Sequence, residues 1–363
     1  MIINVNTQTP YSILVEKGAI DKVGAVTSTI YPPNTKILII SDSNVFPIYG
    51  QRVINSLRKS GFITEFVTFE AGEEYKTLET VQKFYEALTS YNFTRSDLIL
   101  ALGGGVTGDM AGFAAATYLR GIDFIQVPTS LLAQIDSSIG GKTGVDLPQG
   151  KNLVGAFHQP SLVICDPNTI KTLPKDYIID GLGEVVKYAC IDDVELFEKL
   201  ENGSALRDLD DTIYRCINCK RKYVEADPLE KSCRILLNFG HTFGHAIEKL
   251  HKFSGISHGK AVAIGMKLAC EVGEHLGYTE SGTVTRLEKL LISLGLPTES
   301  EFKLDEIIAA TRLDKKSIGK MLKFIFLTEI GKAVAKQEDR NYLILKFKIL
   351  MEQKKRNANS ENN

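Results

Sequence analysis

The sequence predicts an α/β N-terminal domain of the Rossmann-like type, joined to a mostly α-helical C-terminal domain. Up to about residue 170, short β-rich runs alternate with helical patterns, as in a parallel sheet with crossover helices. After about residue 172, long amphipathic helical stretches replace them. At 363 residues, the chain exceeds the size at which one hydrophobic core keeps growing. We therefore expect domains at residues 1–173 and 174–350, and a disordered polar tail at 351–363.

Five runs in the first domain have the composition of strands. They cover residues 36–42, 62–69, 97–102, 123–127 and 162–166. Residues 1–18 also alternate apolar and polar side chains, as a strand does. A largely parallel sheet built from such runs is an architecture that suits dinucleotides.

The second domain carries helical patterns. We expect helices at residues 184–201, 241–253 and 259–277. A further helical run contains Cys216 and Cys219, which we interpret as two thiols on one helix because no second cysteine pair completes a zinc site. Near the end, residues 321–334 and 341–350 have the pattern of short strands or of one hairpin.

Charge and cysteine content narrow the class of protein. With 43 basic and 44 acidic residues, the net charge is -1, so nothing electrostatic favours a nucleic acid or a membrane as partner. The six cysteines are scattered, which favours reduced thiols. The N-terminal segment lacks the basic and then apolar order of a signal peptide. We expect a cytoplasmic protein.

A glycine-rich turn follows the run at residues 97–102. Gly103, Gly105 and Gly108 fit the pattern G-x-G-x-x-G between a strand and a small-residue helix. Such a turn lets backbone N–H groups approach a pyrophosphate, although the same glycines also serve tight packing alone. Asp42 ends a strand and is a better candidate for binding a ribose than Asp123.

Histidines cluster in the second domain. His241 and His245 are separated by one helical turn and share a face. His258 lies close to the start of the next predicted helix, so a helical hairpin could bring it back beside His241. Glu184 supplies a carboxylate from its own helix. Two imidazoles and one carboxylate with an open position describe a catalytic zinc-type site. Taken singly, each histidine is more typical of a helix surface or cap, and His251 keeps that interpretation.

Isolated cations lie between the glycine turn and the domain junction. Arg120, Lys142, Lys151 and Asn152 stand in segments rich in Gly, Ser and Thr, which we interpret as loops. Such loops offer donors to a phosphorylated ligand, although a single surface lysine is usually only solvated.

Taken together, the motifs resemble those of the 3-dehydroquinate synthase family over roughly residues 36 to 335. The resembling segments are GGGVTGDMAGFAAATYLRG, FIQVPTSLLAQIDSSIGGKTGVDLPQGKNLVGAFHQP, GLGEVVKYA, LLNFGHTFGHAIE, HGKAVAIGM and the late DKK. The resemblance implies the fold of that family, NAD and a divalent metal, zinc or cobalt, as cofactors, a phosphorylated sugar acid as substrate, and a homodimer.

The resemblance also implies roles for individual residues. Residues facing NAD would be Asp42, Glu73, Lys76, Gly104, Gly105, Val106, Asp109, Thr129, Ser130, Lys151, Thr169 and Thr172. Metal ligands would be Glu184, His241 and His258. Substrate contacts would be Arg120, Asp136, Lys142, Asn152, Lys187, Lys220, Arg234, Asn238, His245 and Lys315, with Lys316 as the alternative to Lys315.

The reaction of that family converts 3-deoxy-D-arabino-heptulosonate 7-phosphate into 3-dehydroquinate and phosphate, in the second step of the shikimate pathway. Transient oxidation at C5 acidifies the C6 proton, phosphate leaves by β-elimination, C5 is reduced again, and the opened ring closes by an aldol step. Two departures from the family pattern are Thr107, where a larger aliphatic residue is usual, and Asp146, in place of an amide.

Three alternatives to this function remain at this point. Other sugar phosphate cyclases and metal-dependent polyol dehydrogenases share the fold and use NAD. A non-catalytic protein that only binds NAD or metal belongs to a different class, and the presence of the whole polar set speaks against it.

Overall fold

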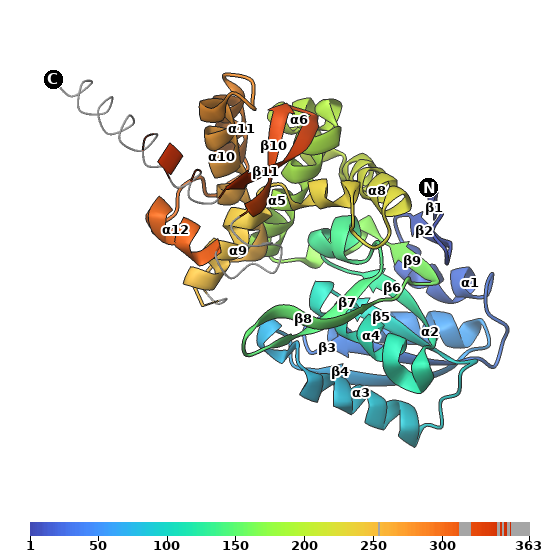
Figure 1. Ribbon diagram of the computed structural model, residues 1–363. Helices are drawn as coiled ribbons and strands as arrows, with labels where there is room; N and C mark the ends of the chain where they lie inside the picture. Colours follow the sequence, from blue (N-terminus) through green and yellow to red (C-terminus); the bar gives the residue numbers. More distant parts are fainter. Residues whose placement is uncertain (253–254, 312–320, 340–341, 343–344, 347–348, 350–363) are drawn as a thin grey trace. The chain divides into compact units, whose positions relative to one another are not determined.

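The computed structural model describes residues 1–252, 255–311, 321–339, 342, 345–346 and 349, and divides into two compact units (Figure 1). The first unit comprises Met1–Ile178 and Leu209–Leu229, and the second Ile179–Asp208 and Glu230–Asn363. The domain division after residue 173 stays a prediction, but the chain returns to the first unit for one helix, α8 (Leu209–Ala226). No described helix has the length and apolar character needed to cross a membrane.

The first unit is built on a seven-stranded sheet in the order β1-β2-β9-β6-β5-β3-β4. Its strands are β1 (Ile2–Val5), β2 (Tyr11–Val15), β3 (Lys36–Asp42), β4 (Ile63–Phe69), β5 (Leu98–Gly103), β6 (Asp123–Pro128) and β9 (Leu162–Cys165). All neighbouring pairs are parallel except β1 and β2. The five predicted strands and the parallel arrangement are therefore confirmed.

Both faces of this sheet are buried, which explains the continuous apolar runs. On β3, Ile37 and Ile39 pack with helices α1 (Val23–Thr27) and α2 (Gln51–Lys59). Leu38 and Ile40 point the other way, towards α3 (Leu78–Ser90) and α4 (Gly105–Thr117). These helices flank the sheet in Figure 1.

The chain order places a switch point beside β3. After β3 the chain moves outward to the edge strand β4, and it then returns to β5 on the other side of β3. Ligands of open parallel sheets bind where such a reversal meets the carboxyl ends of the strands. Asp42 and Gly103 end β3 and β5 at this point.

A hairpin occupies a segment that the sequence led us to interpret as loops. Strands β7 (Lys142–Leu147) and β8 (Gly150–Phe157) pair antiparallel. The loop interpretation of Lys142, Lys151 and Asn152 is therefore wrong, since all three lie within strands. Gly144 and Gly155 face each other there, and a Cβ on Gly155 would lie 2.2 Å from the Thr143 carbonyl oxygen. Glycine, typical of loops, here permits close strand contact.

The second unit is mainly helical, as predicted. Its helices are the larger part of α5 (Lys175–Asp192), α6 (Val194–Glu201), α7 (Ser204–Arg207), α9 (His241–Leu250), α10 (His258–Leu276), α11 (Thr283–Ser293) and α12 (Leu304–Ala310), and its hairpin is β10 (Met321–Glu329) with β11 (Lys332–Asp339). The single helix expected at 184–201 is interrupted, because Asp193 caps a new helix by accepting a hydrogen bond from the Leu196 N–H.

The two predictions for the chain's end have different outcomes. The hairpin of β10 and β11 confirms the strand pattern of residues 321–334. Tyr342, Leu345, Lys346 and Ile349 are helical, so the strand expected at 341–350 is wrong for these residues. The predicted tail at 351–363 lies outside the described residues.

Candidate functional site

Glu184 lies at the centre of a polar cluster in the second unit. It belongs to α5 and is 0% exposed. Neither carboxylate oxygen accepts a hydrogen bond among the described residues, although Lys187, one turn further along the helix, forms an ion pair with it. A buried carboxylate is costly unless it faces a cation, and here Lys187 supplies one.

The α9–α10 hairpin brings two histidines to this carboxylate. Nε2 of His241 and Nε2 of His258 each lie 3.5 Å from Glu184 Oε1. One ligand atom from each of the three residues falls within 4.8 Å of the others. The convergence expected from the sequence spacing is present in the structure.

The ring orientations leave the correct nitrogens available. His241 Nδ1 lies 3.1 Å from the Phe239 carbonyl oxygen, to which it donates when it carries the proton, and Nε2 then faces Glu184 as a lone pair. His258 Nδ1 lies 3.5 Å from Glu248 Oε1 while its Nε2 faces Glu184. A histidine ligand characteristically has a carbonyl or carboxylate on its second nitrogen.

Electrostatics at the two histidines differ. Burial, reinforced by Lys187 and the neighbouring imidazoles, holds the pKa of His241 well below its usual value, so this ring is neutral. Burial also acts to lower the pKa of His258, but the carboxylates of Glu184 and Glu248 outweigh it and raise that pKa to about 10. Carboxylates that attract a proton so strongly at one point attract a metal cation there as well.

The donor set therefore fits a divalent metal. One carboxylate and two imidazoles suit Zn²⁺ or Co²⁺, and no cysteine takes part. Cys216 and Cys219 are buried on α8, which belongs to the first unit, whereas the three ligand candidates belong to the second.

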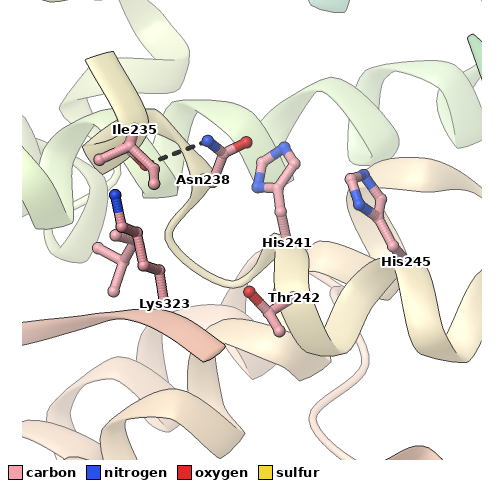
Figure 2. Close-up of a pocket in the computed structure, with 7 residues that line it drawn as sticks. Ile235, Asn238, His241, Thr242, His245 and Lys323 are labelled. Atoms are coloured by element: carbon pink, nitrogen blue, oxygen red, sulfur yellow. Dashed lines mark hydrogen bonds between the residues drawn. The ribbon is translucent and has the colours of Figure 1, made fainter. Parts of the chain in front are cut away.

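A pocket opens beside the histidines (Figure 2). It is lined by Ile235, Asn238, His241, Thr242, His245, Lys323 and Ile325. Figure 2 shows Asn238, His241 and His245 in succession, with Lys323 entering from β10. His245 meets His241 edge-on, with ring centroids 5.4 Å apart. The pocket thus combines a predicted metal ligand with two predicted substrate contacts and one further cation.

Three residues of this region were missed by the sequence analysis. Glu248 follows His241 by seven residues on the same helix face, a spacing that was a usable signal. Glu230 accepts a hydrogen bond from Asn238 Nδ2 at 2.7 Å, and Lys323 lines the pocket. For these two residues the local sequence held no signal, since contacts of the folded chain bring them to the site.

The other predicted substrate contacts are distributed over both units. In the second unit, the Arg234 side chain is 1% exposed, and Lys187 forms its ion pair with Glu184. In the first unit, Lys220 donates to the Asp136 carbonyl oxygen at 2.6 Å and forms an ion pair with the Asp136 carboxylate. Lys315, with its alternative Lys316, lies outside the described residues.

Arg120 stands apart from the remaining candidates of the first unit. It follows α4 at the end opposite the glycine turn, about 20 Å along the helix. It is exposed, with a left-handed φ of 69°. Within the described part of the chain, no hydrogen bond or ion pair joins it to another candidate residue.

The candidates for NAD, apart from Lys151 on β8, gather at the carboxyl ends of the parallel strands. Asp42 ends β3, Glu73 and Lys76 follow β4, Gly104, Gly105, Val106 and Asp109 follow β5, Thr129 and Ser130 follow β6, and Thr169 and Thr172 follow β9. Asp123 begins β6 at the opposite edge, where Tyr31 donates to it. This placement favours Asp42 over Asp123 as the ribose residue.

The glycine turn itself fits a pyrophosphate. Gly104 precedes α4 without any side-chain cap on the first-turn N–H groups, and a Cβ there would meet nothing nearer than Ser130 Oγ at 3.6 Å. An uncapped helix N-terminus with open space beside it accommodates an anion. Gly108 serves packing instead, because a Cβ would lie 2.6 Å from the Gln126 side chain.

Both carboxylate oxygens of Asp42 already accept hydrogen bonds within the protein, which fixes the orientation of this side chain. Its Oδ1 accepts the N–H groups of Asn44 and Val45 at 2.9 Å, and its Oδ2 accepts the Thr107 hydroxyl at 3.2 Å. Thr107, one of the departures from the family pattern, thus orients Asp42. A carboxylate oxygen retains capacity for a second donor.

Comparison with known proteins covers most of the chain. Residues 66–180 match the family "3-dehydroquinate synthase N-terminal" and residues 181–317 match "3-dehydroquinate synthase C-terminal". A 3-dehydroquinate synthase of Clostridium botulinum is 45% identical over 331 residues, which are 90% of this chain and 94% of that protein.

Two solved structures are also similar. A 2-deoxy-scyllo-inosose synthase complexed with carbaglucose-6-phosphate, NAD+ and Co2+ superposes with a TM-score of 0.84 at 28% identity, covering 95% of this chain and 98% of its own. A 2-epi-5-epi-valiolone synthase from Streptomyces hygroscopicus with NAD+ and Zn2+ gives a TM-score of 0.85 at 26% identity, covering 97% and 99%.

Proposed function

Because the chain belongs to the 3-dehydroquinate synthase family, we propose that the polar residues described above carry that family's reaction, which converts 3-deoxy-D-arabino-heptulosonate 7-phosphate into 3-dehydroquinate and phosphate. The cofactors are NAD and a divalent metal ion, zinc or cobalt. The observation that carries the proposal is the buried Glu184 carboxylate, faced at 3.5 Å by one nitrogen of His241 and one of His258.

Glu184, His241 and His258 would hold the metal. When bound, NAD accepts and returns a hydride, and the metal ion polarises the oxygens of the substrate. His241 is suited to ligation because the Phe239 carbonyl fixes its tautomer and burial keeps the ring neutral. Support for zinc or cobalt comes from the nitrogen and oxygen donors.

The residues around the pocket would bind and orient the substrate. Lys187 is a buried ammonium beside Glu184, where it supplies a proton donor and positive charge close to a developing enolate. Asn238 is held by Glu230, so its amide is fixed in place. His245 and Lys323 add further donors on the pocket wall.

The first unit would bind NAD at the carboxyl ends of its strands. The uncapped first turn of α4 receives the pyrophosphate, and Asp42 receives a ribose hydroxyl. Residues 1–173 would thus form the NAD-binding domain and residues 174–350 the metal- and substrate-binding domain. The compact units differ from this division mainly by α8.

Three finer points belong to the proposal. Elimination of phosphate makes the enzyme a carbon–oxygen lyase. A homodimer is supported by Arg120, an exposed substrate candidate placed away from the other candidates of the first unit, where it is available to a second copy. A cytoplasmic location is supported by the six cysteines, none of which forms a disulfide.

Replacement of His258 by alanine tests the metal assignment. We expect His258→Ala to abolish metal-dependent release of phosphate, while NAD still binds, because the histidine lies in the second unit and the glycine turn in the first. Release of phosphate and NAD binding by calorimetry are the measurements. His251→Ala is the matched control, since His251 lies near the end of α9 and pairs with Glu301. Full activity of metal-stripped His258→Ala protein would overturn the assignment.

A further inference from the structure

A buried lysine in the first unit joins residues assigned to different ligands. Lys76 is 3% exposed, and its Nζ donates to Asp109 Oδ2 at 2.6 Å and to Asn152 Oδ1 at 2.7 Å. Burial acts to lower the pKa of Lys76, but the carboxylates of Asp109, Glu73 and Asp146 outweigh it and raise the pKa above its usual value. The group therefore stays an ammonium ion, which donates and never accepts.

This contact fixes the orientation of the Asn152 side chain. Only the carbonyl oxygen of an amide accepts a hydrogen bond from an ammonium, so Oδ1 faces Lys76 and Nδ2 points the other way. No described residue accepts a hydrogen bond from Nδ2, and Asn152 is exposed. Two N–H donors are thus presented on the accessible side of the β7–β8 hairpin.

The backbone of Asn152 is held by Asp146. The pairing of β7 and β8 shifts register between Val145 and Leu147, so the ladder leaves Asn152 without a strand partner. Asp146 Oδ1 accepts the Asn152 N–H at 2.7 Å instead. Asn152 has a left-handed φ of 51°, a conformation that asparagine adopts more readily than most other residues with a side chain.

Asp146 is itself anchored next to Lys76. Its backbone N–H donates to the Lys76 carbonyl oxygen at 2.8 Å. Asp146 and Lys76 therefore hold Asn152 from two sides, one through the backbone and one through the side-chain oxygen.

We propose that Asp146 is a positioning residue for substrate recognition. Asp146 holds Asn152 so that the Nδ2 group of Asn152 donates a hydrogen bond to the phosphate of the substrate. The inference rests on the proposed function and on the family resemblance, which implies that Asn152 contacts the substrate. It also accounts for the departure at position 146. The tether needs only a side-chain oxygen three bonds from Cα, which aspartate and asparagine both provide.

Three variants of the holoenzyme separate this role from a general effect on the hairpin. Asp146→Ala removes the acceptor, Asp146→Asn keeps an oxygen at the same place, and Gln149→Ala is the control at the exposed turn of the same hairpin. The measurements are kcat and KM for the heptulosonate phosphate, the inhibition constant of inorganic phosphate, and the dissociation constant of NAD.

For Asp146→Ala we expect a loss in kcat/KM of roughly ten- to a hundredfold and a weakening of phosphate inhibition of about tenfold, with NAD affinity within about twofold of wild type. Asp146→Asn should restore kcat/KM to within a few-fold of wild type, and Gln149→Ala should match wild type. Equal kinetics and equal phosphate inhibition in Asp146→Ala and wild type would overturn the inference.

A further variant covers the case in which Asp146→Ala fails to fold. Asn152→Asp keeps the oxygen on Lys76 and replaces the Nδ2 donor by a second oxygen, so we expect phosphate inhibition to be lost while NAD still binds. Unchanged phosphate inhibition in Asn152→Asp would contradict the inference. Failure of the proposed function looks different, because wild-type enzyme would then release no phosphate from the heptulosonate phosphate.

Discussion

His258 lies between two carboxylates, each reached by one of its ring nitrogens. Glu184 faces Nε2 and Glu248 faces Nδ1, both at 3.5 Å. If Nε2 binds the metal, Nδ1 keeps its proton and donates to Glu248, which fixes the ring and increases its basicity. Glu248 would therefore influence metal binding without touching the metal.

Replacement of Glu248 tests this arrangement. We expect Glu248→Ala to weaken zinc or cobalt binding by about ten- to a hundredfold, and Glu248→Gln to weaken it less, because an amide oxygen still accepts from Nδ1. Competition with a chromogenic chelator measures the affinity. Glu301→Gln is the matched control, since Glu301 makes a similar 3.5 Å pair with His251. Identical metal affinity in Glu248→Ala and wild type would rule out the role.

The cysteines allow a second test at the scale of single residues. Five of the six are buried, and only Cys233 is partly accessible. Burial raises the pKa of the Cys165, Cys190 and Cys270 thiols, so their reactive thiolate forms are suppressed. We expect a chromogenic thiol reagent at pH 8 to titrate one thiol rapidly in the native protein and six after denaturation. Rapid reaction of two or more native thiols would contradict this burial.

Sequence spacing predicted which side chains lie close together wherever they belong to one helix or to two consecutive helices. His241 and His245 share a face, and a hairpin was enough to bring His258 beside them. Glu230 and Lys323 reach the region through turns and a strand that no local pattern relates to the histidines. Residues of this second kind become visible only in the folded chain.

At the scale of elements, close helix contact sets the geometry of the metal site. Helices α5 and α10 cross at Gly183 and Gly259, where a Cβ on Gly259 would lie 1.8 Å from the Asp180 carbonyl oxygen. The Gly259 N–H also donates to Asp180 Oδ1 at 2.6 Å. Because Gly259 follows His258 directly and Asp180 lies one turn before Glu184, this crossing positions two of the three ligands.

We expect Gly259→Ala to separate these helices. The free energy of unfolding should fall by about 1–3 kcal/mol through overpacking, and metal affinity should fall with it because His258 moves away from Glu184. Gly277→Ala, at the other end of α10, has open space around its Cβ and should cost only about 1 kcal/mol for the left-handed backbone. Chemical denaturation and metal titration are the measurements. Undiminished metal affinity in Gly259→Ala would contradict the account.

The elements themselves were predictable to different degrees. Strands β3, β5, β6 and β9 are buried on both faces and have apolar runs that identify them. The β7–β8 hairpin contains Gly144 and Gly155, which permit close approach of its strands, and glycines of this kind led to the loop interpretation. The break between α5 and α6 depends on one capping aspartate inside an otherwise continuous helical pattern.

For the whole molecule, the fold alone distinguishes fewer possible functions than the sequence motifs do. An α/β unit and a helical unit of this kind also occur in cyclases named for other products. The family match and the 45% identity to a synthase separate this chain from them. Sequence motifs predicted that membership, whereas the spatial link from Asp146 through Asn152 to Lys76 required the structure.

The central claim is most directly tested by assaying phosphate release from 3-deoxy-D-arabino-heptulosonate 7-phosphate while recording absorbance at the NADH wavelength. We predict one phosphate for each 3-dehydroquinate formed, no net accumulation of NADH, complete loss of turnover with a chelator, and recovery on adding zinc or cobalt. Steady accumulation of NADH would indicate a dehydrogenase, and phosphate release from other sugar phosphates but not from this substrate would indicate a different cyclase; either result would contradict the account.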